Sequence, residues 1–369
     1  MAHPSYSFTQ TAWRRLRKNK AGIAGLFIIG LSLMLAIVCY FIAPDATPNA
    51  DRQIVEIQSR KPGFKMTFLK IPKENNTSHI SFFEQLISGK KDSYTFLPIN
   101  GYSLKGNKLI VDKFIDDGVQ EQQEYSISQL SKNSSLTIED LIIKKTFWLG
   151  TDKFGRDILS RLLIGIRVSL SVGLIAVLIS ITIGVLLGSI AGYFRGWADE
   201  VIMWFINVIW SIPTLLLVFA ITLALGKGFW QVFIAVGLTM WVSVARLIRG
   251  QVLSLREMEY IEAARALGYS NTRIIIRHIL PNVLGPVIVI AASNFATAIV
   301  IEAGLSFLGV GVQAPQPSWG LMIKENYNFI ITHNPFLAIA PGIAIMILVL
   351  AFNLLGNGLR DALDVKGKL

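Results

Sequence analysis

Long apolar runs dominate the hydropathy pattern of the chain. One run lies near the N-terminus and five more lie beyond residue 168. About 20 apolar residues in a helix cross the roughly 30 Å of a bilayer's hydrocarbon core. We therefore predict an all-α polytopic membrane protein with six transmembrane helices, over Ile23–Ala43, Ser169–Gly192, Val201–Leu225, Trp230–Val244, Val283–Val310 and Phe336–Leu355.

Residues 44–150 have a different pattern, with no stretch apolar enough to cross a membrane. Two alternating runs flank Gly106-Asn107, a dipeptide suited to a two-residue hairpin turn. In that register Leu104 faces Leu109 and Tyr102 faces Val111, which gives one apolar face. A second alternating strand is expected at Phe64, Met66 and Phe68, and further core candidates are Phe82, Phe83 and Phe96. Roughly a hundred residues can build a small core, so we expect a compact extracytoplasmic insert containing β-structure.

The distribution of charge predicts the orientation. The net charge is +11, and basic residues in short loops favour the cytoplasmic side. Five basic residues precede the first span and six lie in 246–282. We therefore expect cytoplasmic N- and C-termini. The basic N-terminus is expected at 1–22, the first span at 23–43 and the extracytoplasmic insert at 44–150. A core with spans two to six follows at 151–361, with a cytoplasmic loop at 246–282, and a cytoplasmic tail is expected at 362–369.

Several kinds of site are not indicated by the sequence. Cys39 is the only cysteine and lies in an apolar run, so we expect a small buried side chain rather than a disulfide or metal ligand. The four histidines are far apart in sequence, and no metal or catalytic residue is predicted. The nearest approach to a phosphate-binding Gly-x-x-x-x-Gly-Lys-Ser/Thr loop, Gly101 to Gly106, is followed by Asn107. We expect no cofactor on this chain and no nucleic-acid partner.

The segment from Leu253 to Pro281 predicts a helix–turn–helix. A first helix over Leu253–Leu267 can end at Gly268, because glycine accepts the left-handed cap conformation. Ser270 or Asn271 can cap a second helix, and Pro281 marks its end. The first helix offers a surface of small residues for a partner's groove, at Ala263, Ala264 and Ala266.

This segment resembles the signature loop of binding-protein-dependent ABC importer permeases. The matching residues are Glu262-Ala263-Ala264, Gly268 and Leu280-Pro281, with His278-Ile279 typical of the dipeptide and oligopeptide branch. Further stretches from residue 150 onward are similar to the C-type permease of that branch: Gly150–Asp157 with Ser160-Arg161, Arg249–Arg256, Glu302–Gly309, Pro317–Gly320, Ala351–Gly356 and Gly358–Asp361.

The resemblance implies the fold of ABC type I importer permeases and a division of labour. The partners would be a second homologous permease subunit, two cytoplasmic ABC ATPase subunits that hold ATP and magnesium, an extracytoplasmic substrate-binding protein and the lipid bilayer of a bacterial cytoplasmic (inner) membrane. The chain would be a non-enzymatic transporter subunit for di- or oligopeptides or a similar small solute, or for nickel in the same branch. The ATPase-coupling role would fall to Glu262, Ala263, Ala264, Gly268, Leu280 and Pro281.

Other polar residues leave alternatives open. Glu302 lies well inside a span, where a carboxylate usually faces protein or water. We interpret Glu302 as a residue that lines the pathway or forms a hydrogen bond between helices. In the third alternative Glu302 carries protons, which would make the chain a stand-alone secondary transporter. Asp152, Arg156 and Asp157 are further pathway or gate candidates. Gly184, Gly188 and Gly192 predict close helix packing, and the 44–150 insert is either a docking or gating element for the binding protein or a lineage-specific ornament.

Overall fold

The computed structural model describes residues 8–73, 81–130, 138–226, 228–331 and 334–363. These residues form two compact units. The helical unit contains residues 8–33, 168–313 and 343–363, and the sheet unit contains residues 34–167 and 314–342. Three long helices contribute residues to both units: α2 (Lys20–Ile42), α6 (Ile158–Phe194) and α14 (Phe336–Leu363).

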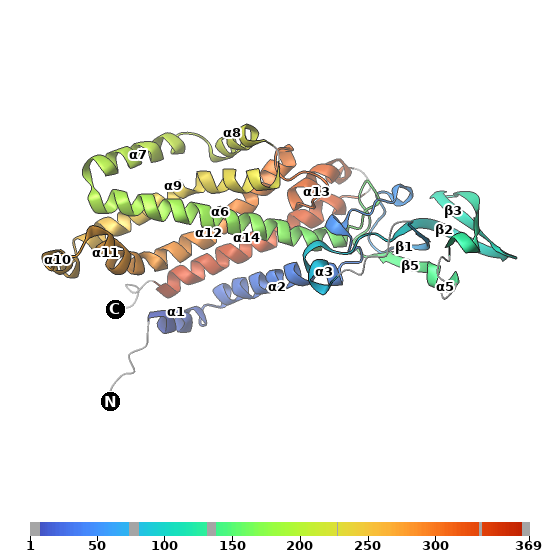
Figure 1. The fold of residues 1–369 in the computed structure, drawn as a ribbon, viewed down its shortest axis with the longest axis horizontal. Coiled ribbons are helices and arrows are strands. Elements are labelled where there is room, and N and C mark those ends of the chain that lie inside the picture. The colour runs from blue at the N-terminus through green and yellow to red at the C-terminus, as the bar shows by residue number, and fades with distance from the viewer. Residues whose placement is uncertain (1–7, 74–80, 131–137, 227, 332–333, 364–369) are drawn as a thin grey trace, which may run out of the picture. The chain divides into compact units, whose positions relative to one another are not determined.

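Five helices are long and apolar enough to cross a membrane, or up to six when one bent pair is counted as a span. The expected all-α membrane fold is therefore confirmed (Figure 1). Cys39 is fully buried, as expected. The long helices are α2 (Lys20–Ile42), α6 (Ile158–Phe194), α9 (Phe229–Arg256), α12 (Leu280–Leu308) and α14 (Phe336–Leu363), and the bent pair is α7 (Gly196–Trp210) with α8 (Thr214–Leu225). A short helix, α1 (Phe8–Leu16), precedes them.

The third predicted span differs from the prediction of a single helix over Val201–Leu225. α7 and α8 meet at an angle of 94° across a break of three residues. Pro213 lacks a backbone N–H, and its ring also disfavours the helical conformation of the residue before it. The apolar run continues through this break, so hydropathy alone does not reveal the bend.

The glycines at 184, 188 and 192 lie where α6 packs against α9. A Cβ atom on Gly184 would lie 2.5 Å from Cβ of Val244, and one on Gly188 would lie 2.5 Å from the carbonyl oxygen of Ala245. Gly192 makes a similar approach to Val252. The interpretation of these glycines as a close-packing face is confirmed.

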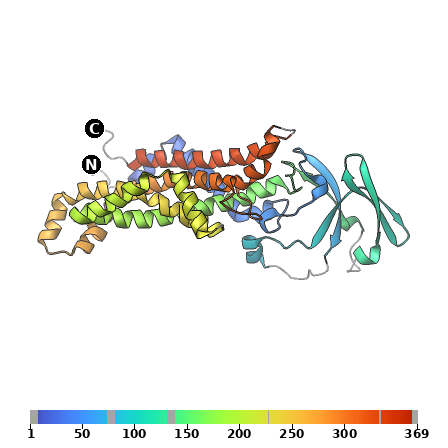
Figure 2. The ribbon, with the colours of Figure 1, turned by 90° about the horizontal axis from the view of Figure 1, so that it is seen from above.

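The sheet unit contains a five-stranded antiparallel sheet with the order β4-β3-β2-β1-β5 (Figure 2). The predicted hairpin is confirmed: Leu104 pairs with Leu109, Tyr102 pairs with Val111, and Gly106 has a φ of 60°. The strands are β1 (Phe64–Pro72), β2 (Tyr94–Lys105), β3 (Lys108–Asp116), β4 (Val119–Ser126) and β5 (Ile142–Phe147); the helices are α3 (Phe82–Ser88), α4 (Ile127–Leu130), α5 (Ile138–Leu141) and α13 (Trp319–Asn326), with 3-10 turns η1 (Pro48–Ala50), η2 (Val55–Ile57) and η4 (Tyr327–Ile330).

Both faces of the sheet are covered. Adjacent residues Phe68 and Leu69 point to opposite faces, and both are fully buried, in separate apolar clusters. The prediction of the core is wrong at some residues. Phe82 and Phe83, which were predicted as core candidates, lie on α3 and are 64% and 71% exposed. On the predicted apolar face of the hairpin, Leu109 and Val111 are buried, whereas Leu104 and Tyr102 are about half exposed.

Candidate functional site

The segment from Leu253 to Pro281, which resembles the signature loop of importer permeases, lies in the helical unit. It folds as a helix–turn–helix that differs in two details from the prediction. The first helix is interrupted: α9 ends at Arg256, and α10 (Glu259–Ala266) starts anew after an extended Met258. This turn brings Ile261 and Ala264 into the apolar cluster that also contains Tyr193 and Ile274. Burial of Ile261 therefore explains a break that the helical pattern of Leu253–Leu267 does not show.

The end of α10 is fixed by hydrogen bonds around Gly268. Gly268 has a φ of 77°, as predicted. Its N–H donates to the carbonyl of Arg265 at 2.9 Å, and the N–H of Tyr269 donates to the carbonyl of Ala264 at 3.2 Å. These two bonds are the pattern of a Schellman motif. The following helix α11 (Asn271–Ile274) is capped by the hydroxyl of Ser270, which accepts from the N–H of Arg273 at 3.4 Å.

The second difference concerns Pro281, which does not end the second helix. A π-helical turn, η3 (Ile275–Ile279), joins α11 directly to α12. Pro281 lies in the first turn of α12. The π-turn changes the hydrogen-bond register just before a residue that cannot donate a backbone hydrogen bond. The helix after the turn and the fifth span are consequently one continuous apolar helix, Asn271–Leu308.

The predicted coupling residues divide into an exposed and an interior set. Glu262, Ala263 and Gly268 are exposed, together with Leu267, which is 72% exposed. Ala264 is buried, so it contributes to the packing of α10 and not to the surface predicted for it. Leu280 is half-buried against the same cluster, and Pro281 is exposed.

Tyr193 of α6 contributes to this segment, although the sequence gives no signal for it. Its hydroxyl group donates to Oδ1 of Asn271 at 2.8 Å, and its backbone carbonyl accepts from Nη1 of Arg256 at 2.6 Å. The guanidinium of Arg265 lies 5.3 Å from the centre of its ring. Tyr193 thus contacts all three helices of the segment. His278 stacks on Tyr269 at 5.9 Å, whereas His3, His79 and His333 lie outside the described residues.

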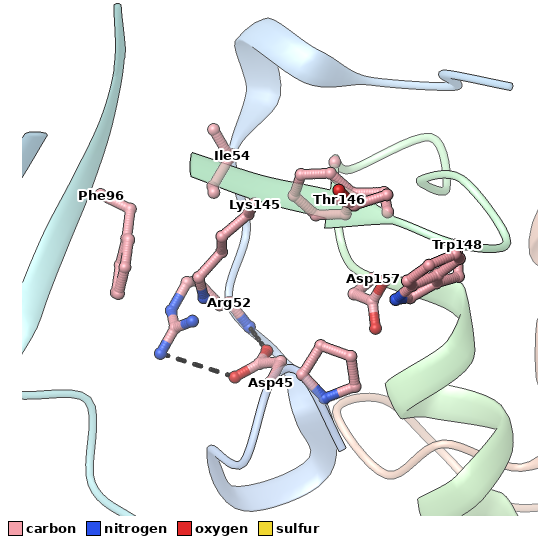
Figure 3. Close-up of a pocket in the computed structure, with 11 residues that line it drawn as sticks. Asp45, Arg52, Ile54, Phe96, Lys145, Thr146, Trp148 and Asp157 are labelled. Atoms are coloured by element: carbon pink, nitrogen blue, oxygen red, sulfur yellow. Dashed lines mark hydrogen bonds and ion pairs between the residues drawn. The ribbon is translucent and has the colours of Figure 1, made fainter. Parts of the chain in front are cut away.

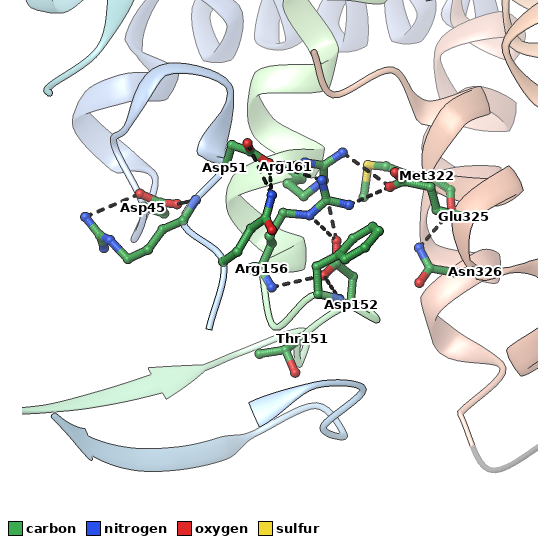
Figure 4. Close-up of polar contacts among 12 residues, drawn as sticks. Asp45, Asp51, Thr151, Asp152, Arg156, Arg161, Met322, Glu325 and Asn326 are labelled. Atoms are coloured by element: carbon green, nitrogen blue, oxygen red, sulfur yellow. Dashed lines mark hydrogen bonds and ion pairs between the residues drawn. The ribbon is translucent and has the colours of Figure 1, made fainter. Parts of the chain in front are cut away.

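Two other predicted residues, Asp152 and Arg156, lie in a buried ion network of the sheet unit (Figure 4). Arg156 donates to Asp152 at 2.6 Å, to Asp51 at 3.2 Å and to Glu325 at 2.6 Å. Arg161 lies 3.6 to 3.9 Å from the same three carboxylates. The side chains of both arginines are 1–2% exposed.

Nearby carboxylates offset the cost of burying these two arginines. Burial opposes the charge on Arg156, but the carboxylates of Asp152 and Glu325 outweigh that effect and hold the pKa of Arg156 above its ordinary value. Removing one partner of a buried ion pair costs about 3–5 kcal/mol. The network therefore ties together the loop after η1, the loop before α6, and α13.

The third predicted residue of this loop, Asp157, caps α6. Its Oδ2 accepts from the backbone N–H of Ser160 at 2.8 Å and also from the Ser160 hydroxyl. Burial raises the pKa of Asp157, even though these hydrogen bonds favour its charged form. Asp157 therefore belongs to the helix start and does not join the network of Arg156.

Glu302 is fully buried in α12. The hydroxyl of Ser306 donates to its Oε1 at 2.7 Å and accepts from the N–H of Val312 at 3.0 Å. These hydrogen bonds lie within α12 and the loop after it. The chain of bonds fixes the end of α12, where Gly309 takes a left-handed cap conformation.

Comparison with known proteins bears on the same segments. Residues 184–366 match the family described as binding-protein-dependent transport system inner membrane component, and residues 7–62 match the N-terminal TM domain of oligopeptide transport permease C. Over 221 residues the chain is 45% identical to the glutathione transport system permease protein GsiD of Pectobacterium atrosepticum, covering 60% of this chain and 73% of that protein. The chain belongs to the binding-protein-dependent ABC importer permeases.

A second sequence relative agrees with this family. The chain is 47% identical to the dipeptide transport system permease protein DppC of Alkalihalophilus pseudofirmus over 221 residues, or 60% of this chain and 72% of that protein. Among solved structures, the inward-facing MetNI methionine ABC transporter is similar at 20% identity with a TM-score of 0.45, covering 55% of this chain and 96% of that chain. The first family match includes both the 257–282 segment and Glu302.

Proposed function

We propose that this permease carries di- or oligopeptides, or a similar small solute, across a bacterial cytoplasmic membrane. The sequence relatives support the substrate class, since their names state glutathione and dipeptide transport. In this proposal a second permease completes the pathway, an external binding protein delivers the solute, and two ATPase subunits hydrolyse ATP with magnesium. The chain's own N- and C-termini face the cytoplasm.

The observation that carries the proposal is the exposed face of α10. Glu262 and Ala263 are exposed there, while Ile261 and Ala264 anchor the opposite face in the apolar cluster. The Schellman motif at Gly268 fixes the helix end. A short helix held rigidly from one side and free on the other is suited to lie in a groove of a partner subunit. We assign the coupling contact to this face.

Cross-linking tests the coupling contact with a matched pair of alanines. The native thiol, Cys39, is buried, so a cysteine introduced on α10 will dominate the reaction with a thiol–amine cross-linker. In the complex with its ATPase subunits, Ala263→Cys should give a permease–ATPase product. Ala264→Cys should not, because position 264 is 4% exposed.

The outcome is interpreted together with transport. If the complex assembles and transports but Ala263→Cys gives no product with an ATPase subunit, the coupling assignment is wrong. Equal products from both variants would also contradict it, because a buried thiol would then be as reactive as an exposed one.

The ion network of Arg156 has a positioning role in this proposal. It joins three segments of the sheet unit through the buried guanidinium of Arg156. Asp157 and Glu302 likewise fix the start of α6 and the end of α12 through hydrogen bonds. We therefore propose that these residues hold the elements in place and that proton transfer by Glu302 is not part of the cycle.

A further inference from the structure

A short helix of the sheet unit, α3, exposes an apolar face. Phe82, Phe83 and Ile87 are 64%, 71% and 65% exposed. With 3.6 residues per turn, these three side chains and the half-buried Leu86 lie within one arc of about 140°. Ser88, which is also exposed, lies on the opposite side of the helix. α3 is therefore amphipathic, and its apolar face is not covered by the rest of the chain.

Phe96, another aromatic residue of the sheet unit, shows how a ring is covered inside this unit. It lines a cavity of about 300 Å³. The guanidinium of Arg52 lies 4.0 Å and Nζ of Lys145 lies 4.4 Å from the centre of its ring (Figure 3). The ring of Phe82 instead lies 5.2 Å from the ring of Phe41, which is itself 42% exposed. The apolar face of α3 is thus joined to an exposed ring of another helix and not to the core of the sheet unit.

Phe41 places α3 at the boundary of the bilayer. It is the last residue but one of the membrane helix α2, and Ile37, one turn earlier, is 58% exposed. The 23 residues of α2 are about 34 Å long, compared with roughly 30 Å of hydrocarbon. The last turn of α2 therefore lies where acyl chains meet headgroups. Through the contact of Phe82 with Phe41, the apolar face of α3 continues the exposed apolar surface of α2 at this level (Figure 1).

Polar contacts fix α3 beside the ends of two membrane helices. Nη1 of Arg167, a residue of α6, donates to the carbonyl oxygens of Leu86 at 3.2 Å and Ile87 at 3.1 Å. A cation is favourable at this C-terminal end of a helix. The same guanidinium lies 5.2 Å from the centre of the ring of Tyr40 on α2. These contacts position α3 without using the side chains of its apolar face.

We propose that α3 is an interfacial helix whose apolar face lies against lipid acyl chains and anchors the sheet unit to the bilayer. Short amphipathic helices bury such a face at the boundary of headgroups and acyl chains, where aromatic side chains are enriched. Lipid is the occupant because the face continues the exposed surface of a membrane helix. The inference requires only that α2 spans the membrane, so it does not depend on the solute, on the ATPase subunits or on the orientation of the chain.

Nitroxide spin labels on the full-length chain in phosphatidylcholine vesicles test the proposal. Cys39 is fully buried, so an introduced cysteine is the one labelled, and the original chain provides the blank. Collision rates are measured with oxygen, which concentrates in acyl chains, and with a polar nickel chelate, which hydrocarbon excludes. Ile37→Cys on α2 is the lipid reference. The aqueous reference is Leu104→Cys: Leu104 is 52% exposed in the hairpin at the far end of β2, about 33 Å along the strand from its start.

We expect the oxygen-to-nickel ratio at Phe83→Cys to exceed that at Leu104→Cys at least about tenfold and to approach that at Ile37→Cys. The matched control on the same helix is Ser88→Cys, whose ratio should be lower than that at Phe83→Cys because it lies on the opposite face. The proposal is overturned if Phe83→Cys has the same ratio as Ser88→Cys or Leu104→Cys. It is also overturned if the label at Phe83→Cys is inaccessible to both reagents, because protein and not lipid would then cover the face.

Discussion

Gly268 gives the sharpest test of how the coupling segment is held. Its φ of 77° is accessible to glycine but strained for other residues, and a Cβ atom there would meet nothing within 4 Å. A side chain at this position therefore costs only the backbone strain of a left-handed residue, about 1–2 kcal/mol. Such a cost changes an equilibrium by a factor of roughly 5–30. Gly268→Ala should lower the equilibrium constant between the capped and the uncapped form of α10 by this factor, and the branched Gly268→Val should lower it further.

The assay is ATP-driven uptake by the reconstituted complex, with permease–ATPase association measured in parallel. We expect Gly268→Ala to reduce both at least about fivefold while the protein still reaches the membrane. Gly250→Ala is the matched control: it is exposed within α9, and a Cβ atom there also meets nothing within 4 Å. Alanine in a helix is favoured over glycine by about 0.5–1 kcal/mol, so this variant should keep full activity. Normal uptake by both Gly268 variants would refute the reasoning.

Three further predictions follow from the buried polar groups. Arg156→Met removes the hydrogen bonds to Asp152, Asp51 and Glu325 and leaves the longer contacts of Arg161. It should destabilise the solubilised chain by about 3–5 kcal/mol, measured as a fall in its unfolding temperature; an unchanged temperature contradicts the network. Glu302→Gln keeps an acceptor for Ser306 and should retain more than about half of the uptake, since a neutral hydrogen bond contributes roughly 1 kcal/mol; complete loss in an assembled complex would favour proton transfer. Burial and Arg52 lower the pKa of Lys145 to about 8. The rate of Lys145 acetylation, measured by mass spectrometry, should therefore reach half of its maximum near pH 8 in the folded protein. In urea the midpoint should lie at about 10.4. Because the folded pKa is the lower one, this lysine's contribution to stability should rise with pH from about 8 to roughly 10, and identical labelling profiles would contradict its burial.

The sequence predicts those features that depend on local pattern. Apolar runs as long as Lys20–Ile42 specify a membrane helix by length alone. Gly106-Asn107 specifies the hairpin register because few residues accept the turn's positive φ. The left-handed Gly268 was predictable for the same reason. In each case the deciding interaction lies within a few residues of chain.

Features that depend on distant partners were not predictable. Glu325 meets Arg156 although the two are far apart in sequence, and neither residue type indicates its partner. Tyr193 joins the coupling segment from another helix, and no motif marks it. The bend before Pro213 is hidden because the apolar run continues on both sides. The exposure of Phe82 was missed because apolar character does not distinguish a core strand from a surface helix.

We propose that this permease transports only when separate ATPase subunits hydrolyse ATP. The most direct measurement is uptake of labelled dipeptide into proteoliposomes that contain the permease pair with or without the ATPase subunits, supplied with the binding protein. We predict uptake with ATP and the ATPase subunits together, and neither uptake nor ATP hydrolysis by the purified chain alone. Uptake by the chain alone, driven by an imposed proton gradient, would contradict it.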